Sequence, residues 1–256
     1  MYPLAVIPHR LENHLGERLA TSFTPGAPGD DALVVIGHGL TSDKDRPWSE
    51  TLSSRFAEAG VASLRFAFAG NGDSEGEFLA SSIAKEVLEL RRVLELVGDR
   101  PIAYVGHSMG GAVGLLTAAQ DARIDVLVSL AAITDAREFV ERMFGDLEEG
   151  APMLGKPQCP FGRVLETNLR DLGSIEAHGA AIGVPWLAVH GTADDMVPAW
   201  NTERLFAANR ERLQVAWLDG VDHSFSGDGL HQLADVVVPW VTDRLSVVRA
   251  AANPSS

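Results

Sequence analysis

The 256-residue chain is 46% hydrophobic and 22% charged, which excludes a disordered or collagen-like protein. Its 21 lysines and arginines against 35 acidic residues give a formal net charge of −14, and no basic run is present to hold a phosphate backbone, so we expect no nucleic-acid partner. At roughly 150 residues per domain the length allows one to two domains, and we expect a single α/β domain over residues 1–256.

Several features predict a cytoplasmic protein with no membrane partner. Cys159 is the single cysteine, so no intrachain disulfide can form and the fold does not depend on an oxidising compartment. The N-terminal segment Met1–Arg10 has no basic start, and its apolar run Leu4–Ile7 is too short for a signal peptide. Nowhere do about 18 uninterrupted apolar residues predict a membrane span.

Short apolar runs alternate with longer helical patterns along the whole chain. The first run, Leu15–Phe23, predicts an antiparallel hairpin at a sheet edge. Strands are then predicted at Ala32–Ile36, Val61–Phe66, Ile102–Val105, Asp125–Ile133, Val184–Val189 and Leu213–Leu218. Helices are predicted at Pro47–Ala59, Ser81–Val97, Met109–Gln120, Ala199–Asn209 and Leu230–Val248. This alternation predicts a mostly parallel sheet with helices on both faces, which binds ligands beyond the carboxyl ends of its strands.

One long segment, about residues 135–181, interrupts the alternation. It holds two helical patterns, Arg137–Phe144 and Arg163–Ile175, on either side of a stretch rich in glycine and proline. Loops this long inside a compact domain are usually functional, and we interpret the segment as a small cap or lid. The alternative is an ordinary crossover helix with an irregular approach.

The sequence Gly106-His107-Ser108-Met109-Gly110 fits the G-x-S-x-G pattern of a nucleophile elbow. It follows a predicted strand directly and opens a predicted helix, which is the strand–turn–helix context that an elbow requires. A second match, around Ser74, has no helix after it and is interpreted as a loop. We therefore expect Ser108 to be the nucleophile.

A serine hydroxyl needs a base, and the base needs an orienting acid. The carboxylates Asp194 and Asp195 follow one predicted strand, and His223 follows the next. The order serine, aspartate, histidine, each after a strand, predicts a catalytic triad in which either aspartate satisfies the spacing.

Donors for a developing oxyanion are expected from two turns. The N–H of Met109 is free at the start of the helix after the elbow. The first long strand ends in Gly37-His38-Gly39-Leu40, a turn that can present backbone N–H groups to the site.

These residues resemble the α/β-hydrolase superfamily, most of all the small-lidded branch of cinnamoyl (feruloyl) esterases and serine-aminopeptidase-like hydrolases. The matching blocks are Gly37-His38-Gly39 with Asp43–Pro47, Leu64-Arg65-Phe66 with Gly70–Gly76, the elbow, Gly191–Pro198, and Asp222-His223-Ser224-Phe225. The resemblance implies Asp194 rather than Asp195 as the acid, and Leu40 and Met109 as the oxyanion donors. One position departs from that branch, because Ala67 stands where an aspartate is usual.

We therefore expect a serine carboxylesterase that acts on small acyl or aryl esters without a cofactor or metal. The alternatives are the same triad acting on an amide, thioester or carbon–carbon bond or as an acyltransferase, and a ligand receptor without turnover. Apolar residues close to the expected site in sequence are candidates for the substrate pocket: Leu40, Trp48, Met143, Phe144, Phe161, Met196 and Trp200.

Overall fold

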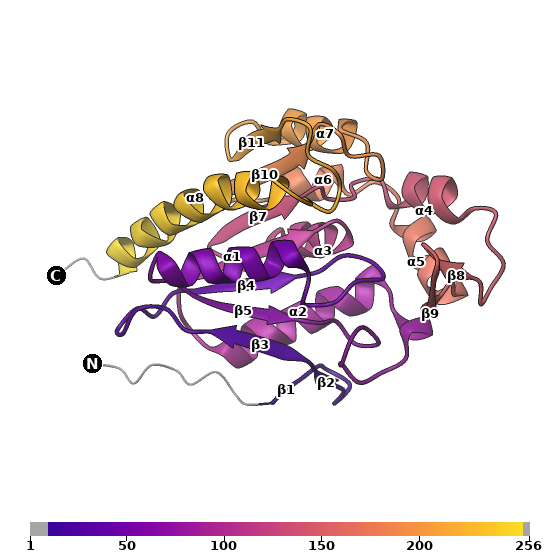
Figure 1. Ribbon diagram of the computed structural model, residues 1–256, viewed down its shortest axis with the longest axis horizontal. Coiled ribbons are helices and arrows are strands. Elements are labelled where there is room, and N and C mark those ends of the chain that lie inside the picture. Colours follow the sequence, from indigo (N-terminus) through magenta and orange to yellow (C-terminus); the bar gives the residue numbers. More distant parts are fainter. Residues whose placement is uncertain (1–9, 253–256) are drawn as a thin grey trace.

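A seven-stranded sheet runs through the protein in the order β11-β10-β7-β6-β4-β5-β3 (Figure 1). The computed structural model describes residues 10–252, so most of the segment on which the signal-peptide prediction rests lies outside them. The strands are β1 (Leu11–Glu12), β2 (Arg18–Leu19), β3 (Thr21–Thr24), β4 (Leu33–Gly37), β5 (Ala62–Phe66), β6 (Ile102–His107), β7 (Val126–Leu130), β10 (Trp186–Gly191) and β11 (Leu213–Leu218). All neighbours in the large sheet are parallel except β3, which pairs with β5 antiparallel. The predicted fold class is confirmed.

Helices cover both faces of the sheet, and the sheet separates two hydrophobic cores. The helices of the main body are α1 (Pro47–Glu58), α2 (Ile83–Val97), α3 (Met109–Ala118), α6 (Glu176–Ala180), α7 (Trp200–Ala208) and α8 (Gly229–Ala252), with a short 3₁₀ turn at Phe78–Ala80. Alternate residues of β4 serve the two cores: Leu33 and Val35 pack towards α2 and α3, whereas Val34 and Ile36 pack towards α1 and α8. No helix within residues 10–252 is both long and apolar enough to cross a bilayer.

The N-terminal hairpin differs from the prediction. Leu15–Phe23 was expected to form it, but residue 15 lies in a turn, β1 pairs with β2 on either side of that turn, and the sheet edge is β3. The reason is local. The Asn13 side-chain oxygen accepts hydrogen bonds from the backbone N–H groups of Leu15 (2.9 Å) and Glu17 (3.0 Å), which closes a turn over residues 13–17, at the start of the apolar run rather than within it.

The segment between β7 and β10 leaves the sheet and returns beside its own starting point. It contains α4 (Ala136–Phe144), β8 (Pro152–Met153), β9 (Lys156–Pro160) and α5 (Arg163–Leu172). At its base an antiparallel bridge joins Asp135 to Ser174. The hairpin β8–β9 was not predicted. It depends on Leu154 (φ 50°) and Gly155 (φ 70°), two successive left-handed residues typical of a type I′ turn. We call residues 135–174 the cap.

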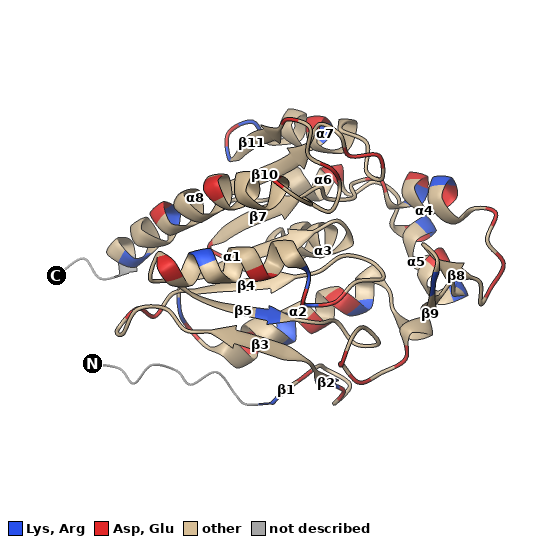
Figure 2. Ribbon diagram, in the orientation of Figure 1, with Lys and Arg blue, Asp and Glu red and all other residues tan. Residues whose placement is uncertain are grey.

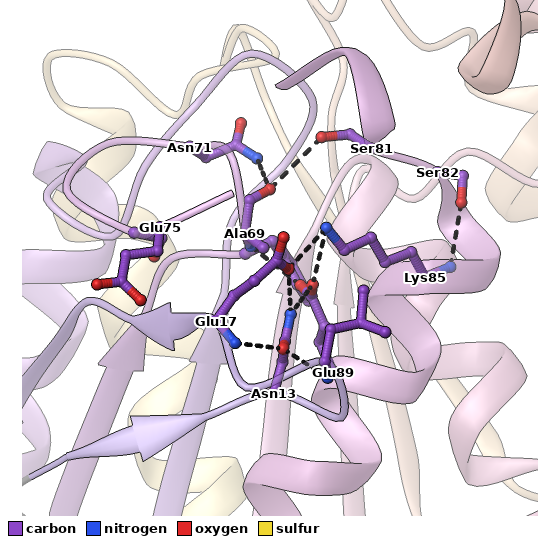
Figure 3. Close-up of polar contacts among 12 residues, drawn as sticks. Asn13, Glu17, Ala69, Asn71, Glu75, Ser81, Ser82, Lys85 and Glu89 are labelled. Atoms are coloured by element: carbon purple, nitrogen blue, oxygen red, sulfur yellow. Dashed lines mark hydrogen bonds and ion pairs between the residues drawn. The ribbon is translucent and has the colours of Figure 1, made fainter. Parts of the chain in front are cut away.

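A buried carboxylate on α2 ties the N-terminal hairpin to the body of the molecule (Figure 3). Glu89 is 0% exposed and accepts hydrogen bonds from the Asn13 amide (2.8 Å) and from the Ala69 N–H (3.0 Å) after β5. Asn13 also donates to Glu17 at 2.6 Å, and Lys85 pairs with Glu17 at 2.8 Å. Burial raises the pKa of Glu89, and the two hydrogen bonds oppose that rise. Glu89 therefore connects three separate segments: α2, the N-terminal hairpin and the chain just after β5.

Replacing this asparagine should cost stability. In Asn13→Ala, Glu89 loses a partner in a water-excluded place, and we expect the free energy of unfolding to fall by about 1–3 kcal/mol. Urea unfolding measures this. Glu12→Ala, at a partly exposed neighbour that pairs with the surface residue Arg10, is the control and should change the value by no more than roughly 0.5 kcal/mol. Equal stability of the two variants would contradict the anchoring role.

Candidate active site

Ser108 stands between β6 and α3 in a strained backbone conformation. Its φ of 53° and ψ of −116° are rare for a residue with a side chain. Its neighbours hold it there, because the Ser108 N–H donates to the Leu130 carbonyl at 2.8 Å and its own carbonyl accepts from the N–H groups of Gly111 and Ala112. The residue is 4% exposed. The sequence prediction of a strand–turn–helix at this serine agrees with the structure.

Two glycines allow the loop after β4 to approach the elbow closely. A Cβ on Gly110 would lie 2.2 Å from the His38 carbonyl oxygen, and a Cβ on Gly39 would lie 2.9 Å from the Ser108 Cβ. Neither position has space for a side chain. This close contact brings the backbone of residues 38–41 beside Ser108.

The predicted acid and base are hydrogen-bonded to each other. The His223 Nδ1 lies 2.8 Å from Asp194 Oδ2, and Asp194 Oδ1 accepts from the N–H groups of Met196 (2.9 Å) and Val197 (2.8 Å). Burial alone would raise the pKa of Asp194, but hydrogen bonds from His190 and His223 outweigh it and hold that pKa well below its usual range. The carboxylate is therefore ionised at neutral pH, as an orienting acid must be.

His190, which is fully buried, holds the acid loop from behind. Its Nε2 lies 2.9 Å from the Val197 carbonyl and 3.3 Å from Asp194 Oδ2, and its Nδ1 lies 2.8 Å from the Thr202 hydroxyl. Since a carbonyl only accepts, Nε2 carries the proton. Asp195, the other aspartate that satisfies the spacing, is exposed. No hydrogen bond or ion pair from Asp195 to another described residue is present.

His107 fixes the backbone of the histidine loop, a role that the sequence did not indicate. Its Nε2 lies 2.8 Å from the His223 carbonyl, which only accepts, so Nε2 donates. The His107 ring packs 4.7 Å from the His223 ring and 5.3 Å from Trp48. Burial, with a smaller contribution from the nearby charge of His223, lowers the pKa of His107 to about 3. The ring is thus a neutral donor at any pH at which the enzyme would work.

His38 plays the corresponding part in the oxyanion loop. Its Nε2 accepts from the Phe68 N–H at 3.0 Å, so its Nδ1 donates to the Gly39 carbonyl at 2.8 Å. Burial lowers the pKa of His38 to about 4 and keeps the ring neutral. In a planar trans peptide the C=O and the next N–H point in opposite directions, so holding the Gly39 oxygen turns the Leu40 N–H away from His38. The His-Gly dipeptide was the signal in the sequence, but the ring's role was not predicted.

The two expected oxyanion donors are available. Within residues 10–252, neither the Leu40 N–H nor the Met109 N–H has a hydrogen-bond partner. Met109 opens α3, where the helix dipole favours negative charge. Two free N–H groups beside a serine hydroxyl can stabilise an oxyanion.

A cavity of about 210 Å³ lies over these groups. Its lining residues are Gly39, Leu40, Thr41, Ser42, Arg46, Trp48, His107, Ser108, Phe139, Leu154, Lys156, Met196, His223 and Ser224. Ser108 and His223 share this cavity without a direct hydrogen bond between them in the described chain, and such contacts often tighten only when substrate binds. No group of three or more metal-ligating side chains occurs among the described residues.

Three of the seven predicted pocket residues line the cavity: Leu40, Trp48 and Met196. The other four, Met143, Phe144, Phe161 and Trp200, are not in its lining. Phe144 and Phe161 are each 2% exposed and pack against one another at 5.8 Å in the core of the cap. Met143 packs against that core, and Trp200 is covered by the Arg204 guanidinium at 4.4 Å. Apolar character alone does not separate the interior of the cap from the pocket it covers.

Comparison with known proteins identifies relatives over most of the chain. Residues 30–233 match a family model described as an alpha/beta hydrolase domain. The uncharacterized protein YfhR of Salmonella typhi is 26% identical over 246 residues, covering 90% of this chain and 80% of that protein. The human mitochondrial palmitoyl-protein thioesterase ABHD10 is 24% identical over 207 residues, covering 74% of this chain and 66% of that protein.

Solved structures with a similar fold include two esterases. Est1E of Butyrivibrio proteoclasticus with bound ferulic acid has a TM-score of 0.81 at 20% identity, covering 93% of this chain and 100% of that chain. The esterase domain of a Rhodothermus marinus protein has a TM-score of 0.73 at 25% identity, covering 91% of this chain and 96% of that chain.

The neutral state of His107 predicts how acid affects stability. A histidine in the unfolded chain gains a proton below a pKa near 6.5, whereas folded His107 stays neutral down to about 3, so acid favours the unfolded chain. The His107→Gln variant lacks the imidazole and therefore loses this destabilisation by acid. When the pH is lowered from 7 to 5, the unfolding free energy of the variant should rise by about 2 kcal/mol relative to that of the wild type. Urea unfolding of both proteins at the two pH values measures the difference, and a constant gap between them would contradict a neutral ring.

Proposed function

Since this chain belongs to the α/β-hydrolase family, we propose that it is a serine hydrolase that cleaves carboxylic esters of small molecules. The observation that carries the proposal is the Asp194–His223 hydrogen bond of 2.8 Å at a cavity that His223 shares with Ser108. The esterases of similar fold support the same reaction type. The absence of any basic run supports a protein without a nucleic-acid partner. The single cysteine supports a cytoplasmic setting.

The first half of the reaction forms an acyl-enzyme. The His223 Nε2 accepts the proton of the Ser108 hydroxyl while the serine oxygen attacks the ester carbonyl. Asp194 holds the His223 Nδ1–H and stabilises the imidazolium. The N–H groups of Leu40 and Met109 receive the carbonyl oxygen as it becomes negative. The tetrahedral intermediate collapses, the bond to the alcohol breaks, and His223 gives its proton to the departing oxygen.

The second half hydrolyses that intermediate. A water molecule loses a proton to the His223 Nε2 and attacks the acyl carbon, again with the oxygen held by the two N–H groups. The bond to the serine oxygen then breaks, and His223 returns the proton to Ser108. Over one cycle ester and water become acid and alcohol, and the enzyme is unchanged.

The size of the cavity favours short acyl or aryl groups. About 210 Å³ lined by apolar side chains such as Trp48, Phe139 and Met196 accommodates a small group better than a long chain. A thioester is the second candidate substrate, because the relative ABHD10 is a palmitoyl-protein thioesterase. The same triad would cleave either bond, and a paired oxygen ester and thioester of one acyl group distinguish them.

Removing the nucleophile tests the proposal. The wild-type protein should hydrolyse p-nitrophenyl acetate and butyrate and react with a fluorophosphonate probe. Ser108→Ala should abolish the labelling and lower kcat by at least about 10³-fold. Labelling that persists in Ser108→Ala would assign the nucleophile elsewhere. A wild-type protein that binds esters tightly without labelling would be a receptor.

The two neighbouring aspartates provide a matched pair for testing the acid. Asp194→Asn removes the charge that stabilises the imidazolium, and we expect kcat to fall by roughly 10³–10⁴-fold. Asp195→Asn makes the same chemical change at an exposed residue and should leave kcat close to the wild type. Steady-state kinetics on one aryl ester compares them. The assignment of the acid is wrong if the second variant is the inactive one.

A further inference from the structure

The cavity over Ser108 is positively charged, although the protein as a whole carries a net charge of −14. Its lining contains Arg46 and Lys156 but no aspartate or glutamate. Acidic residues are instead spread over the surface helices and loops, where many alternate with basic ones (Figure 2). The ionised Asp194 lies behind His223 and is already committed to hydrogen bonds. The cationic lining is therefore not explained by the proposed triad.

Arg46 is held by its backbone and free at its side chain. It is the N-cap of α1, and its carbonyl accepts from the N–H groups of Ser49 (2.9 Å) and Glu50 (3.0 Å). The residue is half-buried and, among the described residues, its guanidinium has no hydrogen bond or ion pair. Its positive charge contributes to lowering the pKa of both His38 and His107, so it acts on the two histidines that flank the site.

The acidic residues of the same loop do not neutralise Arg46. Asp45 pairs with Lys44 and, at 2.9 Å, with Arg65, which also approaches Glu50 at 3.5 Å. The carboxylate of Asp43 accepts from the backbone N–H of residue 45. Two cations of this region are thus paired, and the one that lines the cavity is not.

Lys156 adds a second positive charge from the cap. It begins β9 of the cap, and its ammonium donates to the Thr41 carbonyl at 2.7 Å. An ammonium has three N–H donors, so two remain for a ligand. Thr41 and Arg46 belong to the same loop, so a cation of the body and a cation of the cap both line the cavity that contains the nucleophile.

We propose that Arg46, assisted by Lys156, binds a carboxylate of the substrate, so that the preferred ester carries a negative charge on its acyl or alcohol portion. This inference rests on the proposed serine hydrolase function. A guanidinium presents a planar fork of donors that matches a carboxylate and forms two parallel hydrogen bonds with it. A partly desolvated arginine without a partner is costly, and an anionic substrate group removes that cost on binding. The cationic lining also raises the local concentration of an anionic ester.

Two pairs of esters test the charge on either side of the bond. Mono-p-nitrophenyl adipate and its neutral amide, p-nitrophenyl adipamate, place the carboxylate on the acyl side. Para-acetoxybenzoate and para-acetoxybenzamide place it on the leaving group. The readout is the ratio of kcat/KM for the anionic ester to that for its neutral partner, measured in the wild type, Arg46→Gln, Arg46→Lys and Lys156→Gln. Arg210→Gln makes the same charge change just before β11, at the amino ends of the strands, away from the cavity.

In the wild type, one pair should give a ratio of about 10 or more, because charge-assisted hydrogen bonds of this kind are worth at least about tenfold. Arg46→Gln should lower that ratio by about tenfold, with a smaller loss in Lys156→Gln, partial recovery in Arg46→Lys and no change in Arg210→Gln. Added salt, about 0.5 M, should lower the wild-type ratio as well.

A ratio near one for both pairs in the wild type would overturn the carboxylate subsite, as would an Arg46→Gln variant that loses both esters of a pair equally. Failure of the proposed function looks different. In that case none of the four esters is hydrolysed and Ser108 does not react with a fluorophosphonate.

Discussion

The backbone turn at Ser108 is the constraint on which the rest of the site depends. A residue with a side chain is held at φ 53° between a buried strand and a buried helix. That conformation lifts the hydroxyl off the sheet and also leaves the Met109 N–H without a helical partner. Because Gly110 and Gly39 lack side chains, the loop after β4 can lie directly against this turn. The proposed nucleophile and both proposed oxyanion donors therefore arise from a single packing arrangement.

Around this turn, histidines in one small region have different electrostatic roles. Among the described residues, no carboxylate is hydrogen-bonded to His38 or His107, and burial keeps both rings neutral as hydrogen-bond donors to backbone carbonyls. His190 and His223 both lie against the ionised Asp194, and of these two rings only His223 lines the cavity. In the proposed reaction, a proton taken from Ser108 would therefore go to His223 rather than to His38 or His107. Neutral donors position the backbone, and the hydrogen-bonded pair Asp194–His223 is left for the proposed chemistry.

The sequence predicted those parts of the protein that local rules determine. Alternating apolar runs and caps such as Ser82, whose hydroxyl accepts from the Lys85 N–H, give the strands and helices of the main sheet. Strand–turn–helix context separates Ser108 from Ser74. What the sequence did not predict depends either on local turns, such as those at Asn13 and Leu154, or on contacts between distant segments. The hairpin at Leu154 needs a left-handed residue other than glycine, which no composition rule selects.

The pocket was the least predictable part, because its lining depends on contacts between segments that are distant in the sequence. Phe161 and Trp48 are equally apolar in the sequence, but only the packing of the folded chain decides that Phe161 lies inside the cap and that Trp48 lines the cavity. Arg46 belongs to a block that was noted for its resemblance to a family, and nothing in that pattern shows that its neighbours are paired and it is not. Charge pairing is a property of the folded surface.

The most direct test of the account is a crystal structure of the protein after reaction with a diethyl phosphoryl inhibitor, whose tetrahedral phosphorus mimics the intermediate of ester cleavage. The account predicts phosphorus bonded to the Ser108 Oγ, with the phosphoryl oxygen within hydrogen-bond distance of the Leu40 and Met109 nitrogens and the His223 Nε2 facing the adduct. Phosphorus on another residue, or a phosphoryl oxygen turned away from both nitrogens, would contradict it.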